Sequence, residues 1–327
     1  MGATGPDWEL LNPEQKEVSM TPHTAKKMIP WFAYLLLFTL AAAWGLGACS
    51  SSDYQTPHTT TTSSALIAPE TLKGWNDAGL VNGAGYDRVV VLDVNTPAGY
   101  GAGHISGAHF LNSADISQNR REGPATDVSM VLDGAHMNAL IQKYGIDNKT
   151  TIVFTGGTSA ASASSYLSVT RAYWTFRYWG FSRERLKLVD GINAGWAAAY
   201  GLTTTAPPGP NRSTYTVASN RILRTDLRAS LAEVIDVADG KVPSVATVDF
   251  RSGETDNSYA GQRGKTGGVF GTVSDFVVFE GRIKGARAMT YTDMFDAANT
   301  FRFKSPETLT SLLTGVGINS GLLALVH

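Results

Sequence analysis

Three short motifs occur twice along this chain in the same order, and this repetition constrains the fold more than any other feature of the sequence. Each set begins with a β-branched run that reaches an aspartate, continues with an Ile-x-Gly-Ala turn, and closes with Gly-Ile followed by Asp or Asn. The matching segments are 89–95 with 244–251, 104–108 with 282–286, and 144–147 with 316–319. Repetition in a fixed order predicts two copies of one unit, the second interrupted by a glycine-rich insertion at roughly 252–279.

Within the first copy, β-branched runs alternate with segments of helical pattern. Residues 89–92 and 151–154 are continuous runs that end at Asp93 and Thr155, as strands buried on both faces do. The other predicted elements are helices at 137–144 and 162–179 and a strand at 186–189. This alternation predicts an α/β fold with parallel sheets.

A proline-rich stretch separates the two copies. The sequence Thr-Ala-Pro-Pro-Gly-Pro at 205–210 is typical of a linker, and a length of 327 residues suits two domains. We therefore predict a first domain at 66–205, a linker at 206–216 and a second domain at 217–327.

Alignment of the two copies brings His327 opposite Thr155. The second domain is therefore expected to be truncated, ending before the loop that follows its central strand. Such an end would leave a sheet edge open and expose the apolar residues Leu322, Leu323, Leu325 and Val326.

The N-terminal region has the organisation of a secretory signal. Two lysines precede an almost wholly apolar run at 29–44, small residues follow, and the chain's only cysteine, Cys49, comes next. This order resembles the lipobox of bacterial lipoproteins, whose cysteine receives the lipid. We predict a signal peptide at 1–48 and lipid on Cys49, with a retained membrane helix as the open alternative.

The residues after the cysteine predict how the chain is held. Residues 49–65 are rich in Ser and Thr and are expected to form a flexible tether. The mature chain would be exported and lipid-anchored in the cell envelope. Because Ser50 rather than an acidic residue follows the cysteine, the outer membrane is the expected location.

The charge balance bears on the partners. The formal net charge is −1 and only 17% of the residues are charged, so no broad basic surface is available to neutralise phosphates along a nucleic acid. Nucleic acid is therefore not an expected partner.

The repeated motifs resemble the rhodanese family, sulfurtransferases that are often built from two tandem domains. The first pair is similar to the family's Asp-Val-Arg strand end and its Gly-His-Ile-Pro-Gly-Ala turn. The segments that carry the resemblance are 92–94, 103–108, 189–192 with Trp196, 248–251 and 281–286. The resemblance covers nearly all of 66–327 and implies two tandem rhodanese-like domains, each α/β with a parallel sheet.

The resemblance also implies a chemistry and a position for it. A cysteine directly after the central strand attacks a sulfur donor and holds the sulfur as a persulfide, helped by backbone N–H groups and a helix N-terminus. That position is Thr155 in the first copy and His327 in the second. A threonine hydroxyl cannot form a persulfide, and the loop at 156–161 contains no arginine, so we assign no catalytic residue.

Two sets of residues remain as candidates for a site. The loop could bind a small oxyanion through its N–H groups, and its candidate residues are Thr155, Gly156, Gly157, Thr158 and Ser159. Asp93, Asp249 and Arg251 are expected to organise neighbouring loops rather than to react. His104 has no partner at metal-ligand spacing, so we expect a structural role for it and neither a metal nor another cofactor.

These observations predict a lipid-anchored rhodanese-like protein, catalytically inactive as written, that binds a small oxyanion or a partner protein. Its expected partners are the membrane, through the lipid on Cys49, a small oxyanion or sulfur-containing anion, and an envelope redox protein. The alternative is a thiosulfate sulfurtransferase whose persulfide-forming cysteine lies beyond His327.

Overall fold

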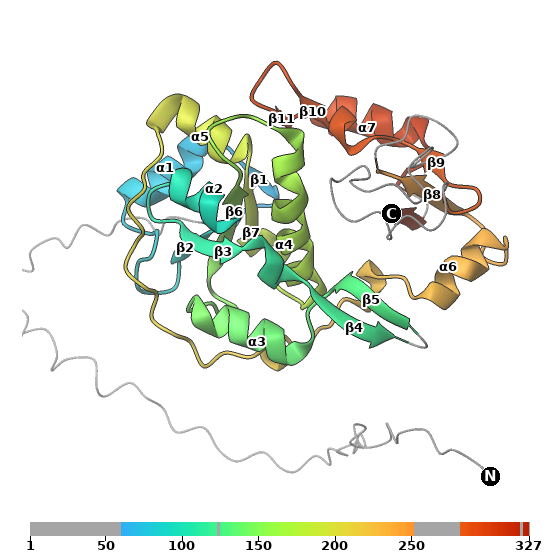
Figure 1. Cartoon of the computed structure of the whole chain (residues 1–327), viewed down its shortest axis with the longest axis horizontal. Helices are drawn as coiled ribbons and strands as arrows, with labels where there is room; N and C mark the ends of the chain where they lie inside the picture. The colour runs from blue at the N-terminus through green and yellow to red at the C-terminus, as the bar shows by residue number, and fades with distance from the viewer. Residues whose placement is uncertain (1–59, 123–124, 252–281, 321–322, 327) are drawn as a thin grey trace, which may run out of the picture. The chain divides into compact units, whose positions relative to one another are not determined.

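The computed structural model describes residues 60–122, 125–251, 282–320 and 323–326 (Figure 1). The signal peptide, Cys49, the glycine-rich insertion and His327 lie outside these ranges, so the predictions about them are not tested by the structure. Within the described ranges, no helix is long and apolar enough to cross a membrane.

The first copy contains a five-stranded sheet with the order β1-β7-β6-β2-β3, in which every neighbouring pair is parallel. The strands are β1 (Leu66–Ile67), β2 (Val89–Asn95), β3 (His109–Asn112), β6 (Thr151–Gly156) and β7 (Leu186–Val189). The predicted strands at 89–92, 151–154 and 186–189 are thus present, and the α/β prediction is confirmed. A separate antiparallel hairpin joins β4 (Gln118–Glu122) to β5 (Ala125–Met130).

Five helices connect these strands: α1 (Pro69–Asp77), α2 (Pro97–Ala102), α3 (Gly134–Lys143), α4 (Tyr166–Tyr178) and α5 (Ile192–Tyr200). Helix α3 begins earlier than predicted because the Asp133 carboxylate accepts a hydrogen bond from the N–H of His136. Helix α4 begins later than the predicted residue 162, because Ser162 caps a short 3₁₀ turn at Ala163–Ser165 that precedes it.

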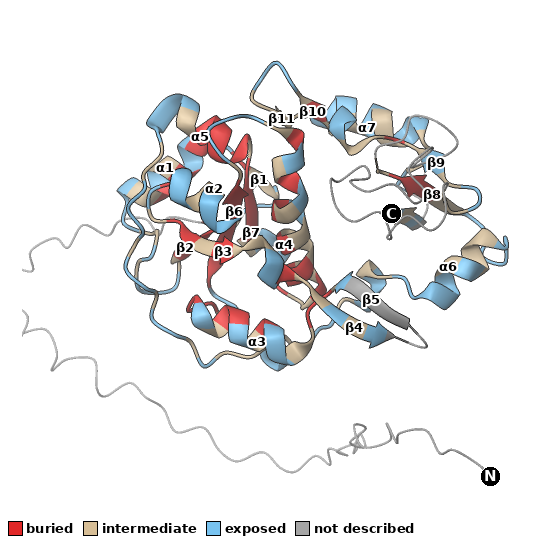
Figure 2. Ribbon diagram, viewed as in Figure 1, coloured by how far each residue is buried: buried red, intermediate tan, exposed pale blue. Residues whose placement is uncertain are grey.

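The alternation of side chains along the strands divides the core into two layers. Val90 and Leu92 pack with α3 and α4 on one face, whereas Val89 and Val91 pack with α1 and α5 on the other. Figure 2 shows that buried residues fill the strands and line the inner sides of these helices. The sheet is therefore covered on both faces, as its apolar strand sequences predict.

The second copy contains a three-stranded parallel sheet that repeats part of the first. Its order β12-β8-β9 corresponds to β6-β2-β3, with β8 at Val245–Asp249, β9 at Arg287–Ala288 and β12 at Leu323–Val326. Val326 pairs with Val248, the residue before Asp249, just as Phe154 pairs with Leu92, the residue before Asp93. The remaining elements are α6 (Leu231–Ala238), α7 (Pro306–Gly315) and the antiparallel pair β10 (Phe295–Asp296) and β11 (Arg302–Phe303).

The exposed strand expected at the end of the second copy is present. The side chain of Val326 is 54% exposed, and Leu325 is half-buried. Leu322 and the side chain of Leu323 lie outside the described part of the chain.

Residues on either side of the predicted first domain at 66–205 pack against it. Thr60, in the predicted tether, is fully buried and its hydroxyl lies 2.7 Å from the hydroxyl of Thr151. Val217 is buried, and the Trp174 indole donates to the backbone oxygen of Leu227 at 3.1 Å. Residues 60, 217 and 227 therefore contact the first copy.

Candidate functional site

Asp93 and Thr155 meet at the carboxyl ends of the two central strands. They are register partners across β2 and β6, and both side chains are fully buried. In an open parallel sheet this edge is where ligands bind. The structure thus brings together two residues that the sequence predicted separately.

Asn193, at the start of α5, links the two side chains. Thr155 Oγ1 donates to Asn193 Oδ1 at 2.8 Å, and Asn193 Nδ2 donates to Asp93 Oδ2 at 2.8 Å. On the other side, Asn95 Nδ2 donates to Asp93 Oδ1 at 3.0 Å. The Thr155 hydroxyl is therefore part of a buried hydrogen-bond network rather than directed to solvent.

The buried position also changes the acidity of the carboxyl group. Burial raises the pKa of Asp93 to about 6, and the hydrogen bonds from Asn193 and Asn95 oppose this increase only in part. The network thus holds a carboxyl group that changes protonation at mildly acidic pH.

The loop after β6 turns one backbone carbonyl inward. The oxygen of Gly157 accepts from Asn95 Nδ2 at 2.7 Å and from Asn193 Nδ2 at 3.0 Å. Because the peptide is planar and trans, the N–H of Thr158 points the opposite way, out of the network. Glycine is required at 157, where φ is +75° and a Cβ atom would lie 2.8 Å from Ser165.

The outer part of the candidate loop is open. Thr158 and Ser159 are exposed, whereas Thr155 and Gly156 are buried. Thr158 Oγ1 accepts from the N–H of Ala160 at 3.2 Å, which stabilises a tight turn. Only the outer residues of the predicted loop site are thus available to a ligand.

A hairpin from the second copy packs near this edge, which the sequence analysis did not predict. Phe295 stacks on Tyr166 at the start of α4 with ring centroids 4.5 Å apart, and Phe303 meets the same ring edge-on. The N–H of Phe303 donates to Asp190 Oδ1 at 3.0 Å.

The hairpin also brings a cation toward the edge of the first sheet. The positive charge of Arg302 opposes the rise that burial causes in the pKa of Asp190, and its stem lies beside Gly191. Arg302 Nε is buried and has no hydrogen-bond partner among the described residues. Arg302 therefore lies beside Asp190 and Gly191, at the turn between β7 and α5.

In the second copy, the aspartate at the end of β8 has a different hydrogen-bond partner. Asp249 is almost fully buried and receives both Nε and Nη2 of Arg251, at 2.8 and 2.6 Å. This bidentate pair fixes the chain after β8. Arg251 holds the position that Asn95 holds in the first copy.

His104 is fixed inside the fold. It is fully buried, its ring stacks on Tyr100 at 3.8 Å, and its ring nitrogens lie 3.1 and 3.2 Å from the backbone oxygens of Tyr100 and Thr205. The geometry agrees with the predicted structural role. In the described part of the chain, no group of three His, Cys, Asp or Glu residues is placed to hold a metal.

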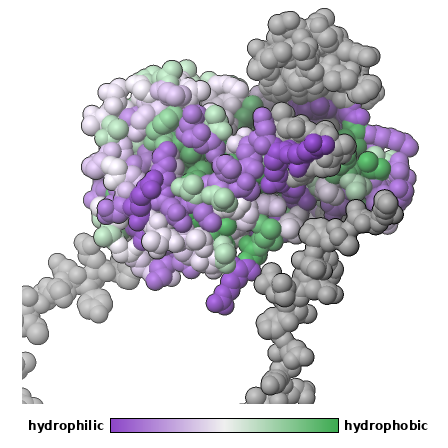
Figure 3. Space-filling view, turned by 60° about the horizontal axis from the view of Figure 1, so that its bottom comes forward, coloured by the Kyte–Doolittle hydropathy of each residue, from purple (hydrophilic) through white to green (hydrophobic). Residues whose placement is uncertain are grey.

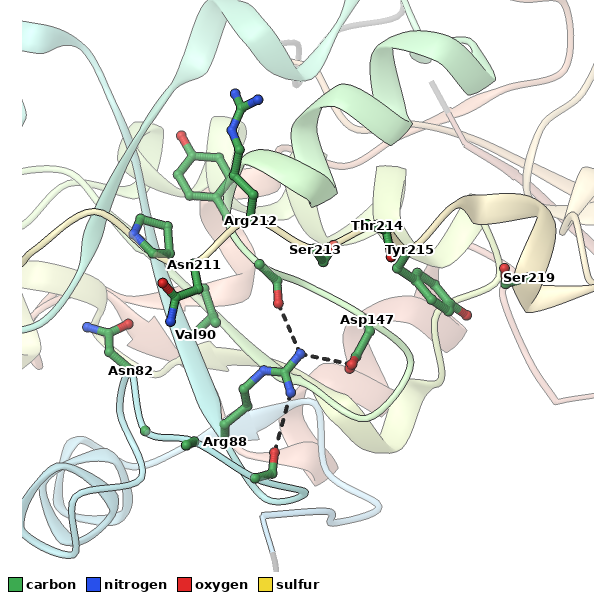
Figure 4. A pocket seen from close by; sticks show the side chains of 16 residues that line it. Asn82, Arg88, Val90, Asp147, Asn211, Arg212, Ser213, Thr214, Tyr215 and Ser219 are labelled. Atoms are coloured by element: carbon green, nitrogen blue, oxygen red, sulfur yellow. Dashed lines mark hydrogen bonds and ion pairs between the residues drawn. The ribbon is translucent and has the colours of Figure 1, made fainter.

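A separate cavity lies at the amino ends of β2 and β6 (Figure 4). It has a volume of about 810 Å³ and is lined by Arg88, Asp147 and the segment Pro210–Tyr215. The Arg88 guanidinium is already bound, to Asp147 at 2.9 Å and to the backbone oxygen of Gly145 at 3.0 Å. The cavity and the Thr155 loop are thus at opposite ends of the sheet.

Comparison with known proteins matches the first copy to a family. Residues 76–199 match the model of the rhodanese-like domain. No curated protein matches the sequence.

Solved structures of similar fold cover most of the chain. One is SseA from Escherichia coli, described with the 3-mercaptopyruvate sulfotransferases, with a TM-score of 0.56 and 15% identity over 80% of this chain and 87% of that one. Another is an anaerobic ergothioneine biosynthesis enzyme from Chlorobium limicola, with a TM-score of 0.60 and 15% identity over 80% of this chain and 60% of that one. At this identity the similarity establishes the fold alone.

Proposed function

Starting from a chain that contains a rhodanese-like domain at 76–199, we propose that it is a catalytically inactive, lipid-anchored binding protein of the cell envelope. Its loop after β6 binds a small oxyanion or the surface of a partner protein. The observation that carries the proposal is Thr155, which stands where the family resemblance places the reactive cysteine and whose hydroxyl is fully buried.

Sulfur transfer by this family needs an accessible thiolate. The group at position 155 is a hydroxyl that donates to Asn193 at 2.8 Å, so it is neither a thiol nor exposed. The only cysteine of the sequence is Cys49, in the predicted lipobox. Acylation of that thiol would remove it from sulfur chemistry.

The binding part of the proposal rests on the outer face of the loop. The N–H of Thr158 points outward, and the hydroxyls of Thr158 and Ser159 are exposed beside it. Backbone N–H groups in such a turn favour an anion. A thiosulfate or sulfate ion has the size and charge that these donors can accept.

Two measurements test the proposal on the full chain. A transfer assay from thiosulfate to cyanide should show no turnover above the uncatalysed rate, and robust turnover would overturn the inactive assignment. Calorimetric titration with thiosulfate should show binding that Thr158→Pro abolishes, because proline lacks the N–H, and that Thr158→Ala retains. Equal binding by both variants would place the anion elsewhere.

Mass measurement of the membrane-extracted protein tests the anchor separately. Acylated Cys49 should be the N-terminal residue, and Cys49→Ser should release the protein from membranes. A mature chain that retains residues 1–48 would contradict the lipid anchor.

A second candidate is a thiosulfate sulfurtransferase whose cysteine lies beyond residue 327. The pairing of Val326 with Val248 favours it, because it matches the pairing of Phe154 with Leu92, so a loop equivalent to 156–161 would follow residue 327. Sequencing of the gene past codon 327 tests this candidate. A continued reading frame with cysteine at the head of a glycine-rich loop supports it, and a genuine stop codon excludes it.

A further inference from the structure

The chain reaches its first domain at the sheet end opposite to Thr155. Thr60 contacts Thr151 at the start of β6, and the N–H of Thr62 donates to the backbone oxygen of Glu184, just before β7, at 3.3 Å. Because Thr60 follows Cys49 by eleven residues, a fully extended chain between them spans at most about 40 Å. This end of the domain therefore stays within about 40 Å of the group that anchors Cys49.

Basic side chains gather at the same end. Arg177 and Arg183 line a cavity of about 470 Å³ together with Ser63. Lys149 and Arg185 both lie over the Tyr86 ring, at 5.7 and 5.0 Å from its centroid. We call this surface the basic pole; its cations are Lys149, Arg177, Arg183, Arg185 and the exposed Arg221, which directly precedes the cavity-lining residue Ile222.

The acidic residues nearby do not cancel this charge. Asp147 is paired with Arg88 at 2.9 Å, and Asp226 with Arg224 at 2.6 Å. Asp87 and Glu184 are the other acidic residues in the segments that form the pole. Five cations therefore face two uncompensated carboxylates, and the pole is positive although the whole chain carries a net charge of −1.

Large apolar side chains stand among these cations. Tyr86 is 61% exposed, Ile222 is 59% exposed and Leu223 is 45% exposed. In the view of Figure 3, hydrophilic side chains dominate the surface and hydrophobic ones form only small, separate areas. Exposed aliphatic and aromatic residues ringed by Lys and Arg are typical of a surface that lies against lipid headgroups.

We propose that the basic pole contacts anionic phospholipid headgroups. Charge attraction supplies the affinity, Tyr86 and Ile222 enter the interfacial layer, and the Thr155 loop at the other end of the sheet faces away from the bilayer. The predicted lipid on Cys49 would hold the pole near the membrane, so the inference rests on the proposed anchoring, but the charged surface itself does not depend on it.

The test uses the full chain reconstituted in vesicles, with Ile222→Cys carrying an environment-sensitive dye and lipids carrying a quencher. Thr158→Cys, in the loop at the far end, is the matched control. Vesicles of phosphatidylglycerol with phosphatidylcholine are compared with phosphatidylcholine alone. A second set of proteins adds Lys149→Gln, Arg183→Gln and Arg221→Gln, whose side chains have no hydrogen bond or ion pair within the described residues.

We expect strong quenching at 222 and little at 158, and only with the anionic lipid. Each cation near an anionic membrane strengthens contact about fivefold, so the triple variant should weaken it about 100-fold. Lys73→Gln, Lys284→Gln and Lys304→Gln together remove the same charge elsewhere and should leave the quenching unchanged.

Equal quenching at 222 and 158, equal quenching on neutral vesicles, or loss of quenching in the control triple variant would overturn the proposal. Failure of the anchor is recognised separately. If Cys49 is not acylated, its free thiol reacts with the dye even in the chain that carries no added cysteine, and high salt washes that chain off the vesicles.

Discussion

Asp93 and Thr155 face each other across the two central strands, and the side-chain amide of Asn193 joins them with two hydrogen bonds of 2.8 Å. The position that the family resemblance assigns to a reactive thiol thus holds a buried hydroxyl, whose hydrogen bond is already made to Asn193. A network built in this way stabilises the sheet edge, and in the function we propose the loop outside it makes the contact with the ligand.

Removal of the bridging amide should destabilise the fold. Asn193→Ala leaves the Thr155 hydroxyl without its partner and the Asp93 carboxylate with only the hydrogen bond from Asn95, in a fully buried location. Unsatisfied buried groups of this kind cost about 2–4 kcal/mol of unfolding free energy. Urea unfolding followed by tryptophan fluorescence measures the loss, and Ser159→Ala, on the exposed loop, should change stability by less than about 0.5 kcal/mol.

The carboxyl group of Asp93 should make stability depend on pH. Burial raises its pKa from 3.8 to about 6, so at intermediate pH the folded chain holds a proton that the unfolded chain has lost. Stability should therefore fall as pH rises from about 4 to about 6, by about 3 kcal/mol in total. Asp93→Asn does not titrate, so the difference in stability between the two proteins should change over this interval. A constant difference would contradict the raised pKa.

Cysteine placed at the reactive position should be inaccessible. Thr155→Cys introduces a thiol where the present side chain is fully buried, whereas Thr158→Cys introduces one on the exposed part of the loop. In chains that also carry Cys49→Ser, maleimide should label position 158 within minutes and position 155 only after unfolding. Thr155→Cys should also fail to transfer sulfur from thiosulfate to cyanide. Rapid labelling at 155 would show that the loop opens in solution.

Much of this architecture follows from local sequence. The strands that end at Asp93 and Thr155 are continuous β-branched runs, and such runs specify burial on both faces without any knowledge of their neighbours. The repeat also sets the register, because Val326 and Phe154 occupy the same place opposite Val248 and Leu92.

The polar network could be predicted only in part. Asp93 and Thr155 stand out at strand ends, but Asn193 lies 38 residues from Thr155 and forms its bonds only when α5 docks on the sheet. An asparagine directly after Gly191-Ile192 was the available signal. Arg302 and the hairpin around it could not be anticipated, because their contact with Asp190 joins residues more than 100 positions apart.

Lys187 should hold residues 60–64 against the first sheet. It is fully buried in β7, and its Nζ donates to the backbone oxygens of Thr62 at 2.8 Å and Ser64 at 2.6 Å. Lys187→Met removes both bonds, so amide hydrogen exchange at residues 60–64 should become faster while the β6 amides stay protected. Lys73→Met, on the surface of α1, is the control and should change neither.

Lys187 should also make the folding stability depend on pH in the alkaline range. Burial lowers its pKa from 10.5 to about 8, so between these values the unfolded chain binds the proton that the folded chain has released. Stability of the wild type relative to Lys187→Met should therefore rise as pH increases from about 8 to about 10.5. A relative stability that falls over this interval would contradict the assignment.

The repeated turn offers a pair of matched substitutions. Gly107 and Gly285 both have φ of +84°, but a Cβ atom at 107 would lie 2.9 Å from Val81, whereas nothing lies within 4 Å at 285. Left-handed backbone alone costs an alanine about 1–2 kcal/mol, so Gly285→Ala should lose that much, and Gly107→Ala should lose more because Val81 must also shift. Gly74→Ala, inside α1 with open space around it, should stabilise by about 0.5–1 kcal/mol. Urea unfolding followed by circular dichroism measures all three, and equal losses at 107 and 285 would show that the contact with Val81 relaxes without cost.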